Sequence, residues 1–195
     1  MGEFFASFEE SWRYFVERTE PLEGFFDDFP DDESAFLEGW LVEPSDEIKA
    51  AARPIKESLA RFPWLFPVPD HFLHVWIGLG ERIGETWKGW RELGSFPIEY
   101  AGVNCFHAAI VVEVKGPMRR LVAGTPNDMP TFLPHMTVAV TREPASPAPL
   151  RDVLAPLRDA VLGHQIVGEV KRVWFPAGRT TLYRPWSEEQ LVPLG

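Results

Sequence analysis

Short apolar runs alternate along the chain with segments whose apolar residues recur at helical spacing. The apolar runs predict strands at residues 35–42, 72–79, 98–106, 108–114, 121–122, 136–140, 168–175 and 180–183. Helical stripes predict helices over residues 48–59, 81–94 and 150–162, the first of them capped by Ser45. Helices interleaved with strands in this way indicate an α+β sandwich.

An amphipathic helix is predicted at the N-terminus, ahead of this alternation. Its aromatic face carries Phe4, Phe8, Trp12 and Phe15 at spacings of four, four and three, opposite a charged face. We expect this face to pack on the main domain, with a lid or a partner-binding helix as the alternative. The acidic residues that follow, up to residue 33, are typical of a solvated linker. We therefore divide the chain into an acidic extension, residues 1–33, and a main domain, residues 34–195.

Charge limits the partners of this domain. The 195 residues carry 19 Lys and Arg against 29 Asp and Glu, a formal net charge of -10. Proteins that hold duplex nucleic acid neutralise many phosphates with basic side chains, so the acidic balance disfavours that function. The acidity is concentrated in residues 1–48, which have 15 acidic and 2 basic residues, whereas residues 115–195 are mildly basic.

Cysteine usage and hydropathy indicate a compartment. Cys105 is the only cysteine, which excludes an internal disulfide and is typical of proteins in the reducing cytosol. No run of about 18 apolar residues is present, and the N-terminus is acidic where a signal peptide is basic. We expect a cytoplasmic protein that does not span a membrane.

Two strand-like segments share one pattern, a histidine followed by alternating side chains. They are His74-Val75-Trp76-Ile77 and His135-Met136-Thr137-Val138, 61 residues apart. Residues i and i+2 of a strand face the same way, so each histidine shares a face with the residue two positions on. Two histidines in one cleft suit acid/base chemistry near neutral pH, and a neighbouring hydroxyl can bind a phosphoryl oxygen without a metal ion. On the residues alone, however, a strand histidine is more often a packed or surface residue whose ring nitrogen is already satisfied.

These segments resemble the paired motifs of the 2H phosphoesterase superfamily, which includes the RNA 2′,3′-cyclic phosphodiesterases also called 2′-5′ RNA ligase-like proteins. The superfamily carries two copies of His-x-Thr/Ser-x, with x hydrophobic, one in each of two related lobes. Residues 134–140, with their leading proline, match the second copy, and residues 74–80 match the first in its histidine and trailing glycines. The order of predicted elements agrees over residues 34–186.

The sequence departs from the family pattern at two positions. Trp76 stands where the family has Thr or Ser, so one of the two hydroxyls that would bind phosphate is missing. An indole offers one N–H donor and a large face that can stack on a nucleobase or fill the lobe. Family members also carry Arg five residues after the second histidine, where this chain has Val140, and Arg142 is the candidate replacement.

The resemblance implies a fold, a reaction and a set of site residues. The fold is a two-lobed α+β sandwich of antiparallel sheets flanked by helices, with the two histidines facing each other across a groove. The reaction is metal-independent hydrolysis of a 2′,3′-cyclic phosphate on a single-stranded RNA end or a small nucleotide. His74 and His135 would be the catalytic pair, with Thr137, Trp76 and Arg142 binding substrate and no cofactor. Arg179 and Arg184 are further cations that we expect near the groove.

Two other functions remain open on the sequence alone. Loss of the first hydroxyl at Trp76 allows a catalytically degenerate module that binds a nucleotide or RNA end. The acidic extension allows an adaptor that binds a protein partner through residues 1–33. Deletion of residues 1–33 should spare activity if the main domain alone holds the site. The Trp76→Thr variant should gain activity if the motif has decayed, and lose binding if the indole stacks on a base.

Metal and cofactor motifs are not recognisable in the sequence. His71 and His74 would point to opposite faces of a strand and so could not chelate one ion. The glycines of residues 78–84 lack the spacing of a dinucleotide-binding loop, and no phosphate-binding loop motif is present. Cys105 has no neighbour that would activate its thiol, so we expect a small buried side chain.

Overall fold

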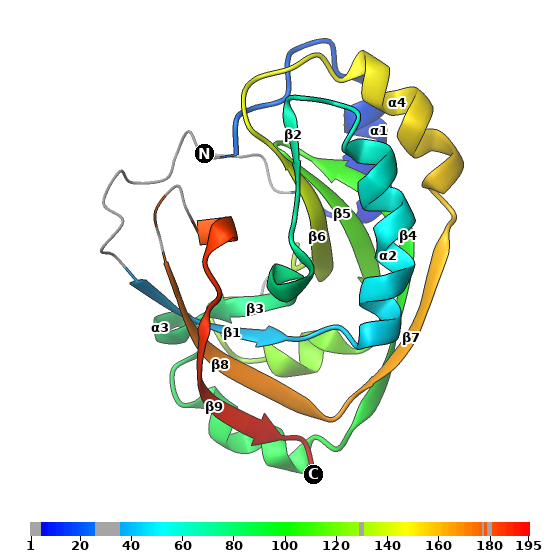
Figure 1. Ribbon diagram of the computed structural model, residues 1–195. Coiled ribbons are helices and arrows are strands. Elements are labelled where there is room, and N and C mark those ends of the chain that lie inside the picture. The colour runs from blue at the N-terminus through cyan, green and yellow to red at the C-terminus, as the bar shows by residue number, and fades with distance from the viewer. Residues whose placement is uncertain (1–4, 26–35, 129–130, 177, 179–180) are drawn as a thin grey trace.

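The computed structural model describes residues 5–25, 36–128, 131–176, 178 and 181–195 (Figure 1). Within these residues the α-helices are α1 (Phe8–Glu17), α2 (Asp46–Leu59), α3 (Gly80–Ile83) and α4 (Ala148–Leu154). The strands are β1 (Phe36–Val42), β2 (Leu65–Pro67), β3 (Val75–Leu79), β4 (Phe96–Phe106), β5 (Ala109–Lys115), β6 (His135–Thr141), β7 (Val161–Val167), β8 (Glu169–Pro176) and β9 (Ser187–Pro193). Short 3-10 turns are η1 (Asp70–Phe72), η2 (Thr86–Glu92), η3 (Met118–Leu121), η4 (Ala155–Leu157) and η5 (Thr181–Tyr183).

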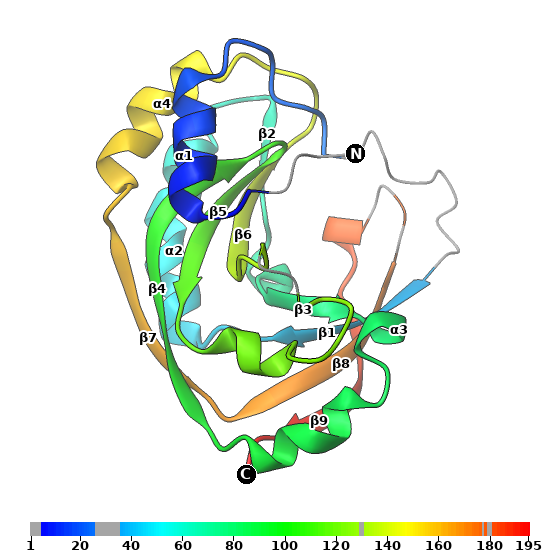
Figure 2. The same ribbon diagram turned by 180° about the vertical axis from the view of Figure 1, so that it is seen from behind.

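The described strands form one antiparallel sheet made of two halves. Its order is β7-β4-β5-β6-β3-β1-β8-β9, with β2 beside β6. The halves join where β6 meets β3, through the single residue pair Val75 and Met136. Figures 1 and 2 show β1 and β3 turning away from the direction of β5 and β6, so the sheet bends at this junction. The predicted α+β fold with two antiparallel lobes is confirmed.

Helix α2 covers one face of the half of the sheet that contains β7, β4, β5 and β6. The hydroxyl of Ser45, the predicted cap, accepts a hydrogen bond from the backbone N–H of Ile48 at 3.4 Å. Pro54 lies inside the helix, which nevertheless continues to Leu59. The buried side chains recur every three or four positions and pack into the core: Ile48, Ala52, Ile55 and Leu59.

Helix α1 packs its aromatic face on strand β4, as the spacing predicts. Phe15 is fully buried in the core, and Figure 2 shows α1 in front of β4 and β5. The hydroxyl of Ser11 donates to the carbonyl oxygen of Cys105 at 3.1 Å, and the amide of Asn104 donates to that of Phe8 at 2.8 Å. Polar contacts therefore fix the helix on the sheet as well as apolar ones.

The chain after α1 also joins the main domain. Leu22 is buried in the same core and bridges to Ala145, and the backbone N–H of Phe25 donates to Thr141 at 2.9 Å. Phe4 and the acidic residues 27–33 lie outside the described residues. The division at residue 33, and a protein partner for residues 1–33, remain predictions.

Several predicted elements differ from the observed ones. Residues 81–94 form α3 and the 3-10 turn η2, because Gly84 ends α3 with a positive φ of 54°. Residues 121–122 belong to the end of η3 and its C-cap, not to a strand. The helix predicted to Leu162 ends at Leu154, since Pro156 lacks the backbone N–H that a continuing helix needs.

The C-terminal part contains two strands that periodicity did not predict. Strand β7 pairs with β4, and β9 pairs with β8 to form the final hairpin. The second strand of that hairpin was predicted at residues 180–183, where residues 181–183 instead form η5. None of the described helices is long and apolar enough to cross a membrane.

Candidate active site

The junction between the two halves of the sheet brings the two histidine motifs together. Val75 and Met136, the pair that joins β3 to β6, are fully buried. Side chains alternate between the faces of a strand, so the residues that flank this pair share the opposite face. Extending the register of this pair by one residue in each direction sets His74 opposite Thr137 and Trp76 opposite His135.

A bulge in β6 completes the face that carries His135. Ile110 of β5 lies opposite Ala139, whereas the next residue, Val111, lies opposite Thr137. Val138 is therefore an extra residue in β6, and the alternation of side chains shifts by one position beyond it. As a result Thr137 and Val140, three positions apart, line the same cavity.

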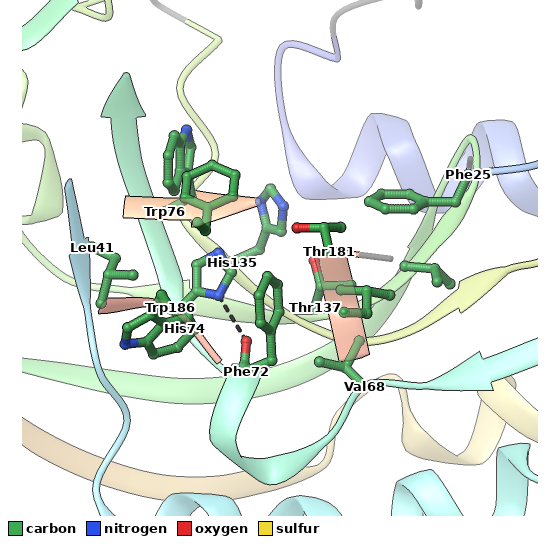
Figure 3. Close-up of a pocket in the computed structure, with 13 residues that line it drawn as sticks. Phe25, Leu41, Val68, Phe72, His74, Trp76, His135, Thr137, Thr181 and Trp186 are labelled. Carbon is green, nitrogen blue, oxygen red and sulfur yellow. Dashed lines mark hydrogen bonds between the residues drawn. The ribbon is translucent and has the colours of Figure 1, made fainter. Parts of the chain in front are cut away.

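All four motif side chains line one cavity of about 380 Å³. Figure 3 shows the rings of His74 and His135 beside each other in it. The rest of the wall is mostly apolar and comes from both halves of the sheet, from the N-terminal segment and from the C-terminal hairpin: Phe25, Leu41, Val68, Phe72, Val140, Phe175, Thr181, Leu182 and Trp186. A pocket of this size suits a small molecule rather than a long polymer.

The two histidines are held by equivalent hydrogen bonds to the backbone. Nδ1 of His74 lies 2.8 Å from the carbonyl oxygen of Phe72, and Nδ1 of His135 lies 2.7 Å from that of Leu133 (Figure 3 draws the first). A carbonyl oxygen can only accept, so each Nδ1 carries the proton and donates it. Nε2 of each neutral ring therefore remains available to a ligand in the cavity.

Burial lowers the pKa of both histidines. Desolvation lowers the pKa of His74 to about 4, and the hydrogen bond to Phe72 opposes this shift, while the nearby His135 adds to it. Desolvation also lowers the pKa of His135, against the hydrogen bond to Leu133. Both rings are thus bases in the empty site at neutral pH, and a bound anion would raise the pKa of each.

Aromatic side chains orient the His74 ring. Phe72, Trp76 and Trp186 all meet it edge to face, with ring centroids 5.4, 6.0 and 5.5 Å away. With the Nδ1 hydrogen bond, these contacts leave the ring one orientation.

The His135 ring is supported from the N-terminal helix. Phe106 meets it edge to face at 4.8 Å, and Phe8 of α1 stacks on Phe106 at 6.2 Å. Helix α1 therefore supports the His135 ring indirectly, through the Phe106 ring that lies between them.

Trp76 occupies space that a glycine on the neighbouring strand provides. A Cβ atom on Gly39 of β1 would overlap the Trp76 ring and would also meet Phe175. Phe175 of β8 contacts the indole edge to face, with centroids 5.3 Å apart. The indole of Trp76 therefore packs against Gly39 and Phe175, and both histidines line the same cavity beside it.

Two of the cations predicted from sequence, Arg142 and Arg184, are described and do not line the cavity. Arg142 is exposed and its guanidinium lies over the Phe66 ring, 5.1 Å from the centroid. Arg184 is also exposed and does not line the cavity, and Arg179 lies outside the described residues. The roles proposed for these arginines remain predictions.

Sequence reasoning missed the cavity residues that distant segments contribute. Phe25 follows α1, while Thr181 and Trp186 belong to the chain between β8 and β9. No spacing links these residues to the histidine motifs, and only the fold brings them there. The described residues contain no group of three His, Cys, Asp or Glu that could hold a metal ion.

The sequence matches no known family profile and no curated protein, whereas several solved structures match the fold. TT0787 of Thermus thermophilus has a TM-score of 0.60 at 16% identity, over 81% of this chain and 97% of that chain. LigT of E. coli complexed with 3′-AMP has a TM-score of 0.56 at 15% identity, over 82% and 98%. A phosphoesterase structure has a TM-score of 0.54 at 12% identity, over 82% and 99%. The chain therefore has the two-lobed fold of LigT and of the 2H phosphoesterases that its histidine motifs resemble.

Proposed function

We propose that this protein is a phosphoesterase that hydrolyses a 2′,3′-cyclic phosphate, on an RNA end or a small nucleotide, without a metal ion. The observation that carries the proposal is the convergence of His74 and His135 on one cavity with both Nδ1 atoms bonded to the backbone. Two such rings can take a proton from one group and give a proton to another.

The reaction needs one proton acceptor and one proton donor. One histidine takes a proton from water through its Nε2, and the water oxygen forms a bond to phosphorus. The bond from phosphorus to one ribose oxygen breaks, and the other histidine gives its proton to that oxygen. In this proposal the hydroxyl of Thr137, which lines the cavity together with His135, donates to a phosphoryl oxygen.

The lowered pKa values fit this scheme once substrate is bound. A neutral histidine is ready to act as the base at pH 7. The acid must carry a proton, and the negative charge of a bound phosphodiester favours the protonated ring and so raises its pKa. The position of the phosphate in the product identifies the ribose oxygen that leaves, which is the first step towards assigning the acid and the base.

The size of the cavity and the fold match favour a mononucleotide or a single-stranded end as substrate. LigT, which shares the fold, has been solved with 3′-AMP, a nucleotide that carries phosphate at the 3′ position. The buried thiol of Cys105, the only cysteine, fits a protein of the cytoplasm.

The test is hydrolysis of each 2′,3′-cyclic nucleotide, and of a short RNA with a 2′,3′-cyclic phosphate end, in EDTA. His74→Ala and His135→Ala should each lower kcat/KM by about 100-fold or more, since general acid/base catalysis contributes that much. His71→Ala is the matched control, because His71 is exposed and does not line the cavity. Folded wild-type protein that binds these nucleotides without turnover would contradict the proposal and favour the non-catalytic binding module.

A further inference from the structure

The hydroxyl of Thr181 is buried at the cavity and has no hydrogen-bond partner among the described residues. The residue is 3% exposed, and its Oγ1 is one of two buried side-chain atoms of the described chain that lack a partner. Thr181 also lines the cavity that holds both histidines. Buried hydroxyls in native proteins are almost always hydrogen-bonded, so an unpaired one needs an explanation.

A backbone hydrogen bond and a buried neighbour hold Thr181 beside the cavity. Its N–H donates to the carbonyl oxygen of Gly178 at 3.0 Å, and the next residue, Leu182, is buried in the core. Thr181 begins the 3-10 turn η5, which follows β8. Figure 3 shows the side chain pointing into the cavity, with its hydroxyl on the side of the His135 ring.

The cavity lacks one hydroxyl that the paired motifs would supply. Thr137 provides the hydroxyl of the second motif, whereas the first motif has the packed indole of Trp76. An indole offers a single N–H donor and no hydroxyl. A phosphoryl group bound between the histidines would therefore find a hydroxyl from β6 and none from β3 at the equivalent position.

We propose that Thr181 supplies the second hydroxyl, donating a hydrogen bond to a phosphoryl oxygen of the bound substrate. The phosphate would then be held between Thr137 of β6 and Thr181 of the C-terminal hairpin. This inference rests on the proposed function, because it names a further residue of that same site. It also explains why the hydroxyl is unpaired in the empty site, since its partner arrives with the ligand.

The test compares Thr181→Val with Thr181→Ser by binding and by turnover. Binding of 3′-AMP and of 2′,3′-cyclic AMP is measured by calorimetry, and thermal unfolding is measured without ligand. Thr181→Val should weaken binding about tenfold, as expected for a hydrogen bond to a charged group, and lower kcat/KM at least as much. Thr181→Ser keeps the hydroxyl and should bind within about twofold of wild type.

Stability without ligand separates this role from a structural one. Because the hydroxyl has no partner in the empty site, Thr181→Val should not lower the Tm. Thr125→Val is the matched control: the Thr125 hydroxyl is buried, donates to Val122 at 2.7 Å and accepts from the N–H of Asn127 at 3.1 Å. That variant should lower the Tm and leave binding unchanged.

The outcomes distinguish this inference from the proposed function. Two results for Thr181→Val overturn the role of Thr181 and leave the phosphoesterase in place. One is turnover equal to that of the wild type, and the other is a lower Tm with unchanged nucleotide binding. If the wild type binds nucleotide without turnover, the proposed phosphoesterase activity is wrong. The ratio of the wild-type and Thr181→Val affinities then still decides the role of Thr181. Failure of the wild type to bind either nucleotide overturns both.

Discussion

His74 and His135 make the same hydrogen bond, each from Nδ1 to the carbonyl oxygen of the residue two positions before it. The two motifs therefore agree in backbone geometry as well as in sequence pattern. The two hydrogen bonds are alike even though the first motif has Trp76 where the second has Thr137. Trp76 contacts the His74 ring edge to face, and the bond from His74 to the backbone is present beside it. The backbone just before each strand holds the histidine, and the residue two places after it forms part of the cavity wall.

Stability should fall with acidity as His74 becomes protonated. The pKa of His74 is about 4 in the folded protein and about 6.5 when the chain unfolds. Between these values the unfolded chain binds more protons, so the contribution of His74 is complete above pH 6.5 and is lost as the pH falls towards 4. Between pH 7.5 and 4.5, the free energy of unfolding should therefore fall by on the order of 2 kcal/mol less in His74→Gln than in the wild type. Urea unfolding at the two pH values measures this difference.

An exposed histidine provides the comparison for that experiment. His71→Gln is the matched control for the substitution itself, since the His71 side chain is exposed and does not line the cavity. Equal loss of stability in wild type and His74→Gln would show that His74 keeps its ordinary pKa in the folded protein.

Gly39 and Trp76 should be energetically coupled. The Gly39→Ala substitution places a methyl group against the indole in the middle of the sheet and should cost about 1–3 kcal/mol. In a Trp76→Thr background the same substitution should cost under about 1 kcal/mol, because the overlapping ring is gone. A double-mutant cycle of unfolding free energies measures the difference, and additive effects would contradict the packing described here.

Removal of the N-terminal segment should impair the protein, in contrast to the expectation from sequence. Phe15 is part of the core, and Phe25 forms part of the cavity wall. Phe15→Ala should cost about 3–5 kcal/mol of unfolding free energy. Val16→Ala, on the exposed side of α1, should change it by less than about 0.5 kcal/mol. Full activity and stability after deletion of residues 1–33 would show that the segment is dispensable.

Cys105 should react only when the protein unfolds. Its thiol is buried, and burial raises its pKa to about 12, so it stays protonated at pH 8. A disulfide reagent should label the native protein far more slowly than the protein in denaturant. Rapid labelling of one thiol under native conditions would place Cys105 at the surface.

Much of the fold could be predicted from the periodicity of the sequence. The capped helix α2 and the alternating strands β4, β5 and β6 were predicted within two residues at each end. Periodicity failed where apolar residues continue past a change of structure. Val161 prolongs the helical stripe of α4, yet it is 61% exposed on the edge strand β7 and adds little to any core.

The candidate site was predictable only as far as local spacing reaches. Residues i and i+2 of a strand share a face, which correctly placed His74 with Trp76 and His135 with Thr137. The support of His135 by Phe106, and the approach of Thr181 from the C-terminal hairpin, depend on contacts between segments far apart in sequence. Such contacts leave no local signature in the sequence.

The single pair of Val75 and Met136 has a mechanical consequence. Inside each half of the sheet, ladders of several residue pairs resist bending, whereas one pair carries the junction. A small rotation of one half against the other would change the separation of the histidine rings before it disturbed either set of ladders. The two histidines thus lie on either side of the junction with a single residue pair, and a phosphate that contacted both rings would link the two halves of the sheet.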